Sequence, residues 1–350
     1  MRWQRITDMD CCNPYRMKVK GEVTMEKLKE WSKKNAVVIV LLGLIVFFGI
    51  ANKTFLTPTN VINITAQMSI NALLCVGITY VIITGGIDIS IGSVAAFAGI
   101  FAAYLGLKFP DAPLVIILFI QIGSAVLIGG ICGLFNGIMI AKFKVVAMIA
   151  TLAMMTMARG LAYVITDGQP VYGLPDSFAW LGAGRLLKTE SVPLGIIPII
   201  TIFTIIIVVL MHLLLTKTVF GRHVFAVGSN EKVAHLSGIN VDWVKIRAHI
   251  ICSIMAALGG VCVTSKLNNG QPAACDAYEM YAIAATVLGG TSFLGGIGSV
   301  LRAMIGCAII AIINNGMNLM QISSYWQKVI MGLIILLAVI VDMAQKREKD

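Results

Sequence analysis

Residues 217–247 read KTVFGRHVFAVGSNEKVAHLSGINVDWVKIR and form the longest polar interval between two strongly apolar stretches of the chain. Within this interval Asn230 is suited to cap a short helix, Glu231 lies in the first turn of that helix, and Gly238 follows its end. Asn240 is suited to cap the next helix, with Asp242 in its first turn. The pattern predicts a short surface helix over about 231–237. A solvated linker with ordinary caps would carry the same signals.

The composition of the whole chain indicates an integral membrane protein. Of the 350 residues, 58% are hydrophobic and 13% are charged, and the mean hydropathy is +0.89. A soluble domain has about 45–50% apolar and about 25% charged residues. Apolar runs of about 20 residues fit spanning helices, and the alternation typical of a β-barrel is missing. The net charge of +10 bears on orientation, because basic residues collect on the cytoplasmic side, and does not indicate nucleic-acid binding.

The apolar runs predict an all-α membrane protein with about ten transmembrane helices. We expect these helices over residues 36–51, 61–83, 91–107, 114–141, 145–165, 194–215, 248–265, 280–292, 298–316 and 325–342. If the chain starts inside, this number places residues 142–144, the 217–247 loop and both termini on the cytoplasmic side, where most of the Lys and Arg then lie. The expected organisation is a cytoplasmic tail at 1–34, a transmembrane domain at 35–342 and a cytoplasmic tail at 343–350.

Two glycine-broken segments, one in each half of the chain, resemble each other. They carry Gly85, Gly86, Gly92 and Ser93 in the first half, and Gly289, Gly290, Gly298 and Ser299 in the second. Each glycine pair ends one apolar run, and the next apolar run opens shortly after it. Paired interruptions of this kind point to a pathway between structural repeats. The alternative is that glycine is common in membrane helices because it lets them pack closely.

Polar residues within the apolar spans are candidate pathway residues, because a charge in lipid is costly and turns toward protein or water. Asp88 could cap the helix that follows it or contact a solute. Arg159 could snorkel to the outer surface or line a vestibule. Asp276 and Glu279 are first-turn acids at the expected outer start of the eighth span. The full candidate set is Asn71, Gly85, Gly86, Asp88, Ser90, Gly92, Ser93, Asn136, Arg159, Glu279, Gly289, Gly290 and Asn315.

The Asn side chains of this set suit a hydroxyl-rich solute better than an ion. An Asn amide both donates and accepts hydrogen bonds, as the hydroxyl groups of such a solute require. The same Asn side chains would also hold neighbouring helices together. His249 lies one residue into the expected seventh span, and we expect it at the membrane interface.

The motifs that the chain lacks separate classes of transporter. It contains no G-x-x-x-x-G-K-[ST] loop for ATP, no H-E-x-x-H or G-x-S-x-G motif, and no metal-ligand spacing among its eight cysteines. No span carries a series of Asp, Glu and His that would relay protons. We therefore expect a pore that is driven by a partner, with no enzyme activity, cofactor or metal of its own. A stand-alone carrier or channel, or a structural scaffold, is the alternative from another class.

Four segments of the chain resemble a known family. They are ITGGIDISIGSV (83–94), FGRHVFAVGSNEKVAHLSGINV (220–241), YEMYAIAATVLGGTSFLGGIGSV (278–300) and NNGMNLMQISSYWQKVI (314–330). From about residue 36 to its C-terminus, the chain resembles the permease subunit of ribose-type ABC importers, a family that includes galactoside, xylose and autoinducer-2 permeases. Another small polar solute, such as a branched-chain amino acid, a nucleoside or autoinducer-2, is the alternative within transport.

The resemblance implies an importer of several subunits in the bacterial inner membrane. Two copies of the permease would form one pathway at their interface, and partner ATPase subunits would bind ATP and magnesium on the cytoplasmic side. An extracytoplasmic binding protein would deliver a monosaccharide, with ribose as the first expectation. The 217–247 loop would dock on the ATPase, with matching positions at Gly228, Asn230, Glu231, Ala234, Gly238 and Ile239. The family often has Gly-Gly-Asn where this chain has Gly228-Ser229-Asn230.

Overall fold

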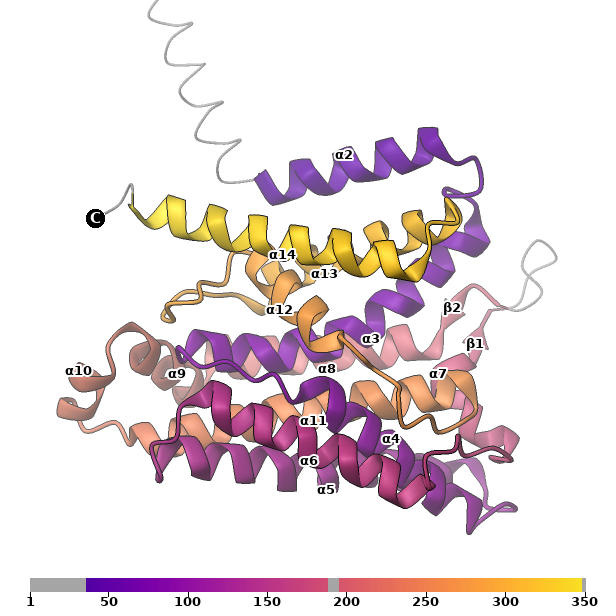
Figure 1. Ribbon diagram of the computed structural model, residues 1–350, viewed down its shortest axis with the longest axis horizontal. Coiled ribbons are helices and arrows are strands. Elements are labelled where there is room, and N and C mark those ends of the chain that lie inside the picture. Colours follow the sequence, from indigo (N-terminus) through magenta and orange to yellow (C-terminus); the bar gives the residue numbers. More distant parts are fainter. Residues whose placement is uncertain (1–35, 188–194, 348–350) are drawn as a thin grey trace, which may run out of the picture.

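The computed structural model describes residues 36–187 and 195–347, which fold mainly into helices (Figure 1). The long helices are α2 (Ala36–Ala51), α3 (Pro58–Ile83), α4 (Ile91–Leu107), α5 (Leu114–Ala141), α6 (Ala147–Thr166), α8 (Ile199–Lys217), α11 (Val241–Leu267), α13 (Val300–Leu319) and α14 (Ser324–Arg347). The short elements are η1 (Asp176–Ala179), α7 (Trp180–Ala183), α9 (Val219–Ser229), α10 (Glu231–Leu236), α12 (Tyr278–Leu288) and the antiparallel pair β1 (Arg185–Leu186) and β2 (Ile197–Pro198).

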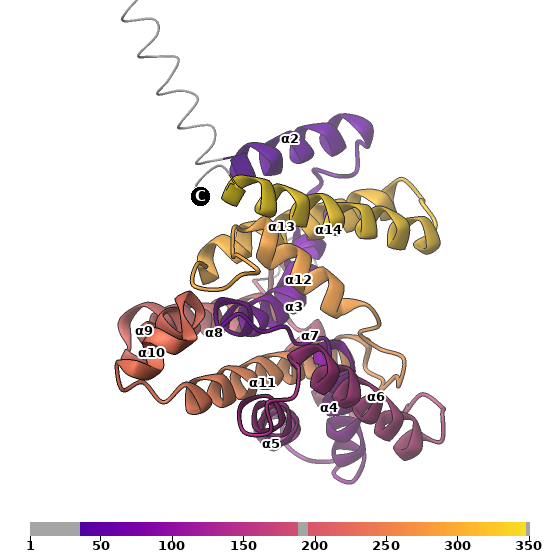
Figure 2. The same cartoon turned by 60° about the vertical axis from the view of Figure 1, so that its left-hand side comes forward.

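Apart from α12, the short elements gather at two opposite ends of the helical bundle (Figures 1 and 2). One end carries α9 and α10, and we call it the α10 end. The other end carries α7, β1 and β2. The tail expected at 1–34 and residues 348–350 of the expected C-terminal tail lie outside the described residues, whereas 343–347 continue α14.

In the described ranges, six helices are long and apolar enough to cross a membrane, namely α3, α5, α6, α8, α11 and α13. Residues 37–51, 91–107 and 324–337 form shorter apolar helices. The expected helices at 36–51, 91–107 and 114–141 have the boundaries that we predicted. The span expected at 280–292 is shorter in the structure than we predicted, because α12 has only 11 residues. A helix of that length covers about 16 Å, roughly half of a 30 Å hydrocarbon layer.

The polar interval 217–247 contains more helix than we predicted. The surface helix expected near 231–237 is α10, and the Asn230 side chain accepts a hydrogen bond from the Val233 N–H at 3.0 Å, as its capping role requires. The additional helix is α9, which precedes α10 and was not predicted. The predicted cap at Asn240 is confirmed, because α11 begins at Val241, the Asn240 side chain accepts from the Trp243 N–H at 3.1 Å, and Asp242 lies in the first turn.

Glycines bring the central helix α11 into backbone contact with α5. Gly129, Gly133 and Gly137 are four residues apart and so share one face of α5. A Cβ on Gly133 would lie 2.5 Å from the His249 carbonyl oxygen and 2.6 Å from Ile250 Cα, and one on Gly137 would lie 2.7 Å from Ile246 Cα. Small residues allow such close crossings where lipid removes the hydrophobic drive between helices.

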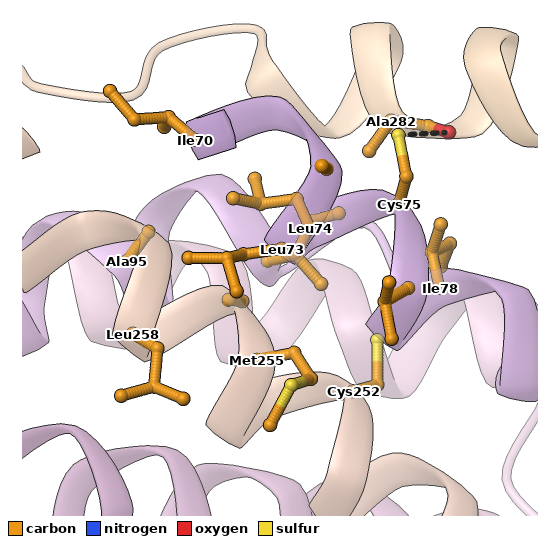
Figure 3. Close-up of a cluster of buried hydrophobic side chains, with 14 of the residues drawn as sticks. Ile70, Leu73, Leu74, Cys75, Ile78, Ala95, Cys252, Met255, Leu258 and Ala282 are labelled. Carbon is orange, nitrogen blue, oxygen red and sulfur yellow. Dashed lines mark hydrogen bonds between the residues drawn. The ribbon is translucent and has the colours of Figure 1, made fainter. Parts of the chain in front are cut away.

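The opposite faces of α11 pack on α3 and α4 in the same way. A Cβ on Gly77 of α3 would lie 2.8 Å from the Cys252 carbonyl oxygen, and one on Gly260 would overlap the Ala95 carbonyl of α4. Figure 3 shows the seam between these helices, which is filled by buried side chains of α3 and α11, with Ala282 of α12 beside Cys75. The Cys75 thiol donates to the Ala282 carbonyl at 3.7 Å.

Two helices start inside the bundle rather than at one of its ends. After α3 the chain turns at Gly85, re-enters through residues 86–90 and starts α4 at Ile91, which is fully buried. After α11 the chain re-enters through residues 268–277 and starts α12 (Figure 1). The two starts meet, because a Cβ on Gly92 would lie 2.6 Å from the Cys275 carbonyl oxygen and would overlap the Glu279 carboxylate.

The crossing of α5 and α11 can be tested by adding a single methyl group. We expect Gly133→Ala to lower the midpoint of thermal unfolding in detergent by several degrees, because overpacking costs about 1–3 kcal/mol. Gly130→Ala is the matched control, since a Cβ there meets nothing within 4 Å and Ala favours helix over Gly. Equal midpoints for the two variants would contradict the close crossing.

Candidate coupling and translocation site

Three segments meet at the α10 end in what we call the glycine junction, formed by Ile83, Gly85, Gly228, Gly295 and Gly296. The Gly296 N–H donates to the Ile83 carbonyl at 2.9 Å. A Cβ on Gly228 would overlap that carbonyl and lie 2.6 Å from the Gly296 nitrogen. Gly295 has a φ of +82° and packs on Gly228 and Gly85. The ends of α3 and α9 and the loop after α12 are therefore in backbone contact.

The helix α10 projects from this junction. Asn230 ends α9 and caps α10, and the buried Ala234 faces the bundle. Gly238 follows with a φ of +81°, a conformation in which a side chain would be strained, and the Ile239 N–H closes the turn on the Ala234 carbonyl at 3.1 Å. Outward, α10 presents the apolar side chains Val233 and Leu236, and Leu236 is 85% exposed.

Ion pairs connect this surface to the bundle. Glu231 of α10 pairs with Lys245 of α11 at 2.7 Å, and Lys144 in the α5–α6 turn pairs with Asp242 at 2.9 Å. Pairs at a surface contribute about 0–1 kcal/mol, so the Glu231–Lys245 pair orients α10 on α11 without fixing it, and the Lys144–Asp242 pair holds the α5–α6 turn to the start of α11. A cavity of about 670 Å³ lies between these elements, and its lining includes Gly86, Gly228, Glu231, Lys245 and His249.

A buried polar cluster, formed by Asp88, Ser90 and Asn136, holds the re-entrant segment 86–90 against α5. Asp88 accepts from the Ser90 N–H at 2.9 Å and from its hydroxyl at 2.6 Å, and Asn136 donates to the Ser90 hydroxyl at 3.1 Å. All three side chains are fully buried. Asp88 therefore organises the turn that starts α4, and its carboxylate faces protein.

His249 is buried in the protein. Since α11 starts at Val241, His249 is two turns into the helix and only 1% exposed, so protein surrounds the imidazole, and its place at the membrane interface stays a prediction. Its Nδ1 is 2.9 Å from the Lys245 carbonyl oxygen, and its Cε1 is 3.7 Å from where a Cβ on Gly86 would stand. The imidazole thus supports the turn between α3 and the re-entrant segment.

A second cluster, formed by Gly92, Arg159 and Glu279, lies where α4 and α12 begin. Arg159 of α6 donates through Nη1 to the carbonyls of Pro272 at 2.6 Å and Ala274 at 2.8 Å. Arg159 therefore holds the second re-entrant segment instead of snorkelling. Glu279 lies in the first turn of α12, as we predicted. It is buried beside Gly92, because residues 268–277 carry the chain inward before α12 begins.

The remaining candidates lie elsewhere. Asn315 exchanges two amide hydrogen bonds of 2.9 Å with Asn60, which ties α13 to the start of α3. Gly289 lets α12 cross α13, since its Cβ would lie 2.5 Å from the Arg302 carbonyl oxygen, and Gly290 turns the chain with a φ of +86°. Ser93 is buried in the first turn of α4, and Asn71 is half-buried on α3.

Several residues of the site were missed from the sequence. Gly295 and Gly296 begin five residues after Gly290, the second residue of the glycine pair that we singled out. The recurrence of a Gly-Gly pair within this segment was the signal that could have identified them. Lys245 and His249 are four residues apart in the helix predicted after the Asn240 cap, and this spacing, which puts them on one face of that helix, was the available signal. Lys328, which pairs with Asp276 at 3.0 Å, had no local signal.

Comparison with known proteins places the chain among membrane permeases. A family model described as the permease component of branched-chain amino acid transport systems matches residues 60–339. The chain belongs to this family. With the apolar helices described above, membership makes it a multi-pass protein of the bacterial inner membrane.

Relatives in this permease family resemble the chain over most of its length. The ribose import permease protein of Bacillus subtilis is 42% identical over 299 residues, covering 85% of this chain and 89% of the relative. The ribose import permease protein of Escherichia coli K12 is 39% identical over 319 residues, covering 90% and 95%. The D-allose transport system permease protein of the same strain is 34% identical over 312 residues, covering 89% and 92%. No solved structure matches the chain.

The glycine junction predicts a local effect of one methyl group. We expect Gly228→Ala to speed amide hydrogen exchange in a peptide covering 289–299 by about fivefold, because the Gly296 hydrogen bond is lost and such a bond contributes about 1 kcal/mol. The control is Ser237→Ala, which removes an exposed hydroxyl bonded to the Val233 carbonyl of its own helix. Unchanged exchange in Gly228→Ala would show that the three segments are not held together there.

Proposed function

We propose that the chain is the transmembrane permease subunit of an ABC importer that carries a monosaccharide, with ribose as the first candidate. The similarity to ribose import permeases at 42% and 39% identity over nearly the whole length carries this proposal. The D-allose and L-arabinose permeases at 34% identity support a sugar as the solute class. Like the permease component that defines its family, the chain is not itself a catalytic subunit.

The proposed arrangement has ten transmembrane segments, with both termini and the α10 end in the cytoplasm. The distribution of charge supports it, because the α10 end carries basic residues from several segments, and basic residues favour the cytoplasmic side. They are Lys142, Lys144, Lys217, Arg222, Lys232, Lys245 and Arg247. In this arrangement α12 and the re-entrant segment before it cross the membrane together, which explains why α12 alone is too short.

At the α10 end, the proposed partner is the ATPase subunit, which would bind ATP and magnesium. Two features support docking there, namely the exposed apolar side chains Val233 and Leu236 and the shallow cavity beside α10. A short helix that offers an apolar tip within a polar rim resembles the buried core of a protein interface. We therefore assign the coupling role to α10, with Asn230 and Gly238 setting its ends.

Movement of α10 would reach the re-entrant segments through two contacts. The first is the glycine junction, where displacement of Gly228 displaces Ile83 and Gly296 because no free space separates them. The second is the Glu231–Lys245 pair, which leads to His249 and the turn at Gly86. In the proposed cycle, a second copy of the chain completes the pathway, and a binding protein delivers the sugar at the opposite end. Contacts along the pathway stay weak, since a transporter must release its solute.

Docking through α10 can be tested with a substitution that introduces one charged side chain. We expect Leu236→Glu to reduce co-purification of the cognate ATPase subunit by at least tenfold, because a carboxylate would be buried in an apolar contact. Leu186→Glu is the control, since Leu186 is an exposed leucine on β1 at the opposite end. Retention of the ATPase by Leu236→Glu would rule out α10 as the docking element.

The solute can be tested in cells that lack the chromosomal copy of the gene. We expect the deletion to abolish high-affinity uptake of radiolabelled D-ribose, and the wild-type chain to restore it. D-allose, L-arabinose and L-leucine are tested in parallel. Restoration of L-leucine uptake alone would favour an amino acid permease, the solute named in the family description. Uptake without the ATPase would favour a stand-alone carrier.

A further inference from the structure

An exposed ion pair marks one face of the chain. Asp276, at the end of the second re-entrant segment, pairs with Lys328 of α14 at 3.0 Å, and the two side chains are 68% and 60% exposed. Tyr278 and Tyr281 follow on α12 with their ring centroids 5.9 Å apart. Figure 1 shows this segment, in orange, between α14 and the pair of helices α4 and α6.

The pair lies deep along the bundle. The Cys275 carbonyl, which is bonded to the Asp276 nitrogen, lies 2.6 Å from the position of a Cβ on Gly92. Gly92 is the second residue of α4, and α4 continues to Leu107 before the polar turn that begins at Lys108. The distance from Gly92 to that end is about 22 Å along the helix. Asp276 is therefore within a hydrocarbon layer of about 30 Å, and Lys328, the fifth residue of α14, reaches it from about one turn inside the end of the bundle opposite to α10.

Charges at this depth constrain what covers them. Ionised side chains inside a membrane protein face the protein interior or water, because exposure to lipid is costly. Asp276 and Lys328 are not covered by the described part of the chain. The face that carries them is thus unsuited to lipid, in contrast to the face of α14 that exposes Leu333 and Leu337.

The same face has the chemistry that binds polyhydroxylated molecules. Carboxylates accept hydrogen bonds from hydroxyls, the Lys ammonium donates to them, and aromatic rings offer apolar surfaces with a polar edge. Glu279, three residues after Asp276 and buried beside Gly92, adds a second carboxyl group. Arg159 fixes the segment from the other side through the Pro272 and Ala274 carbonyls.

We infer that Asp276 and Lys328 line the water-filled pathway and contact the solute as it passes. The inference rests on the proposed function and names the solute-contacting residues within it. An exposed ion pair contributes only about 0–1 kcal/mol, so sugar hydroxyls replace it at little cost and leave again. Weak binding of this kind suits a pathway that must release its solute.

Thiol labelling of the assembled importer tests the pathway assignment. Lys328→Cys and, as control, Leu333→Cys are expressed with the ATPase and the binding protein, and treated with a charged methanethiosulfonate reagent. Both positions are exposed on α14, and Leu333 is 57% exposed. We expect Lys328→Cys to react at least tenfold faster, because charged reagents reach water-lined but not lipid-facing thiols. The wild-type chain gives the background labelling of the native cysteines.

A second measurement tests the solute contact. We expect saturating D-ribose to slow labelling of Lys328→Cys several-fold during turnover, and Asp276→Asn to change the KM of ribose uptake by several-fold. Equal labelling at Lys328→Cys and Leu333→Cys would overturn the pathway assignment. Labelling without protection and an unchanged KM would overturn the contact. Wild-type ribose uptake is measured in the same cells, so that its absence would instead indicate failure of the proposed function.

Discussion

The hydrogen bond from the Gly296 N–H to the Ile83 carbonyl is the contact on which the rest of the arrangement depends. Backbone groups in a membrane must be paired within the protein, so a helix can be interrupted only where other backbone reaches it. Here the partner for the end of α3 comes from the loop after α12, more than 200 residues away in the chain, and Gly228 packs against both. Glycine is required because any side chain would separate the three segments.

This constraint connects α10 to the two re-entrant segments. On one side of the junction is α10, whose exposed leucine and valine make up the proposed docking surface. On the other side are the two re-entrant segments, each held by its own polar contacts, Asp88 with Asn136 in one case and Arg159 with two carbonyls in the other. Because the starts of α4 and α12 meet at Gly92, a shift at either segment changes the packing of the other.

Much of the fold was readable from the sequence, and the site only in part. Apolar runs give the boundaries of α2, α4 and α5, and the cap at Asn230 gives α10, because both signals are local. The depth of Glu279 was not readable, since hydropathy does not distinguish a helix that starts at the membrane surface from one that starts inside. The partners of Arg159 and Asn315 lie 113 and 255 residues away, and one sequence carries no signal of such pairs. The ten spans and the coupling role stay predictions.

The central claim is that the chain forms a translocation pathway but does not itself supply the energy for transport, which an ATPase subunit docked at the α10 end would provide. Reconstitution into liposomes tests it directly, with the binding protein and D-ribose outside and with ATP and the ATPase enclosed. The account predicts that ribose accumulates against its gradient only when the permease, the ATPase and ATP are all present. Accumulation by the chain alone, in response to a proton or sodium gradient, would contradict it.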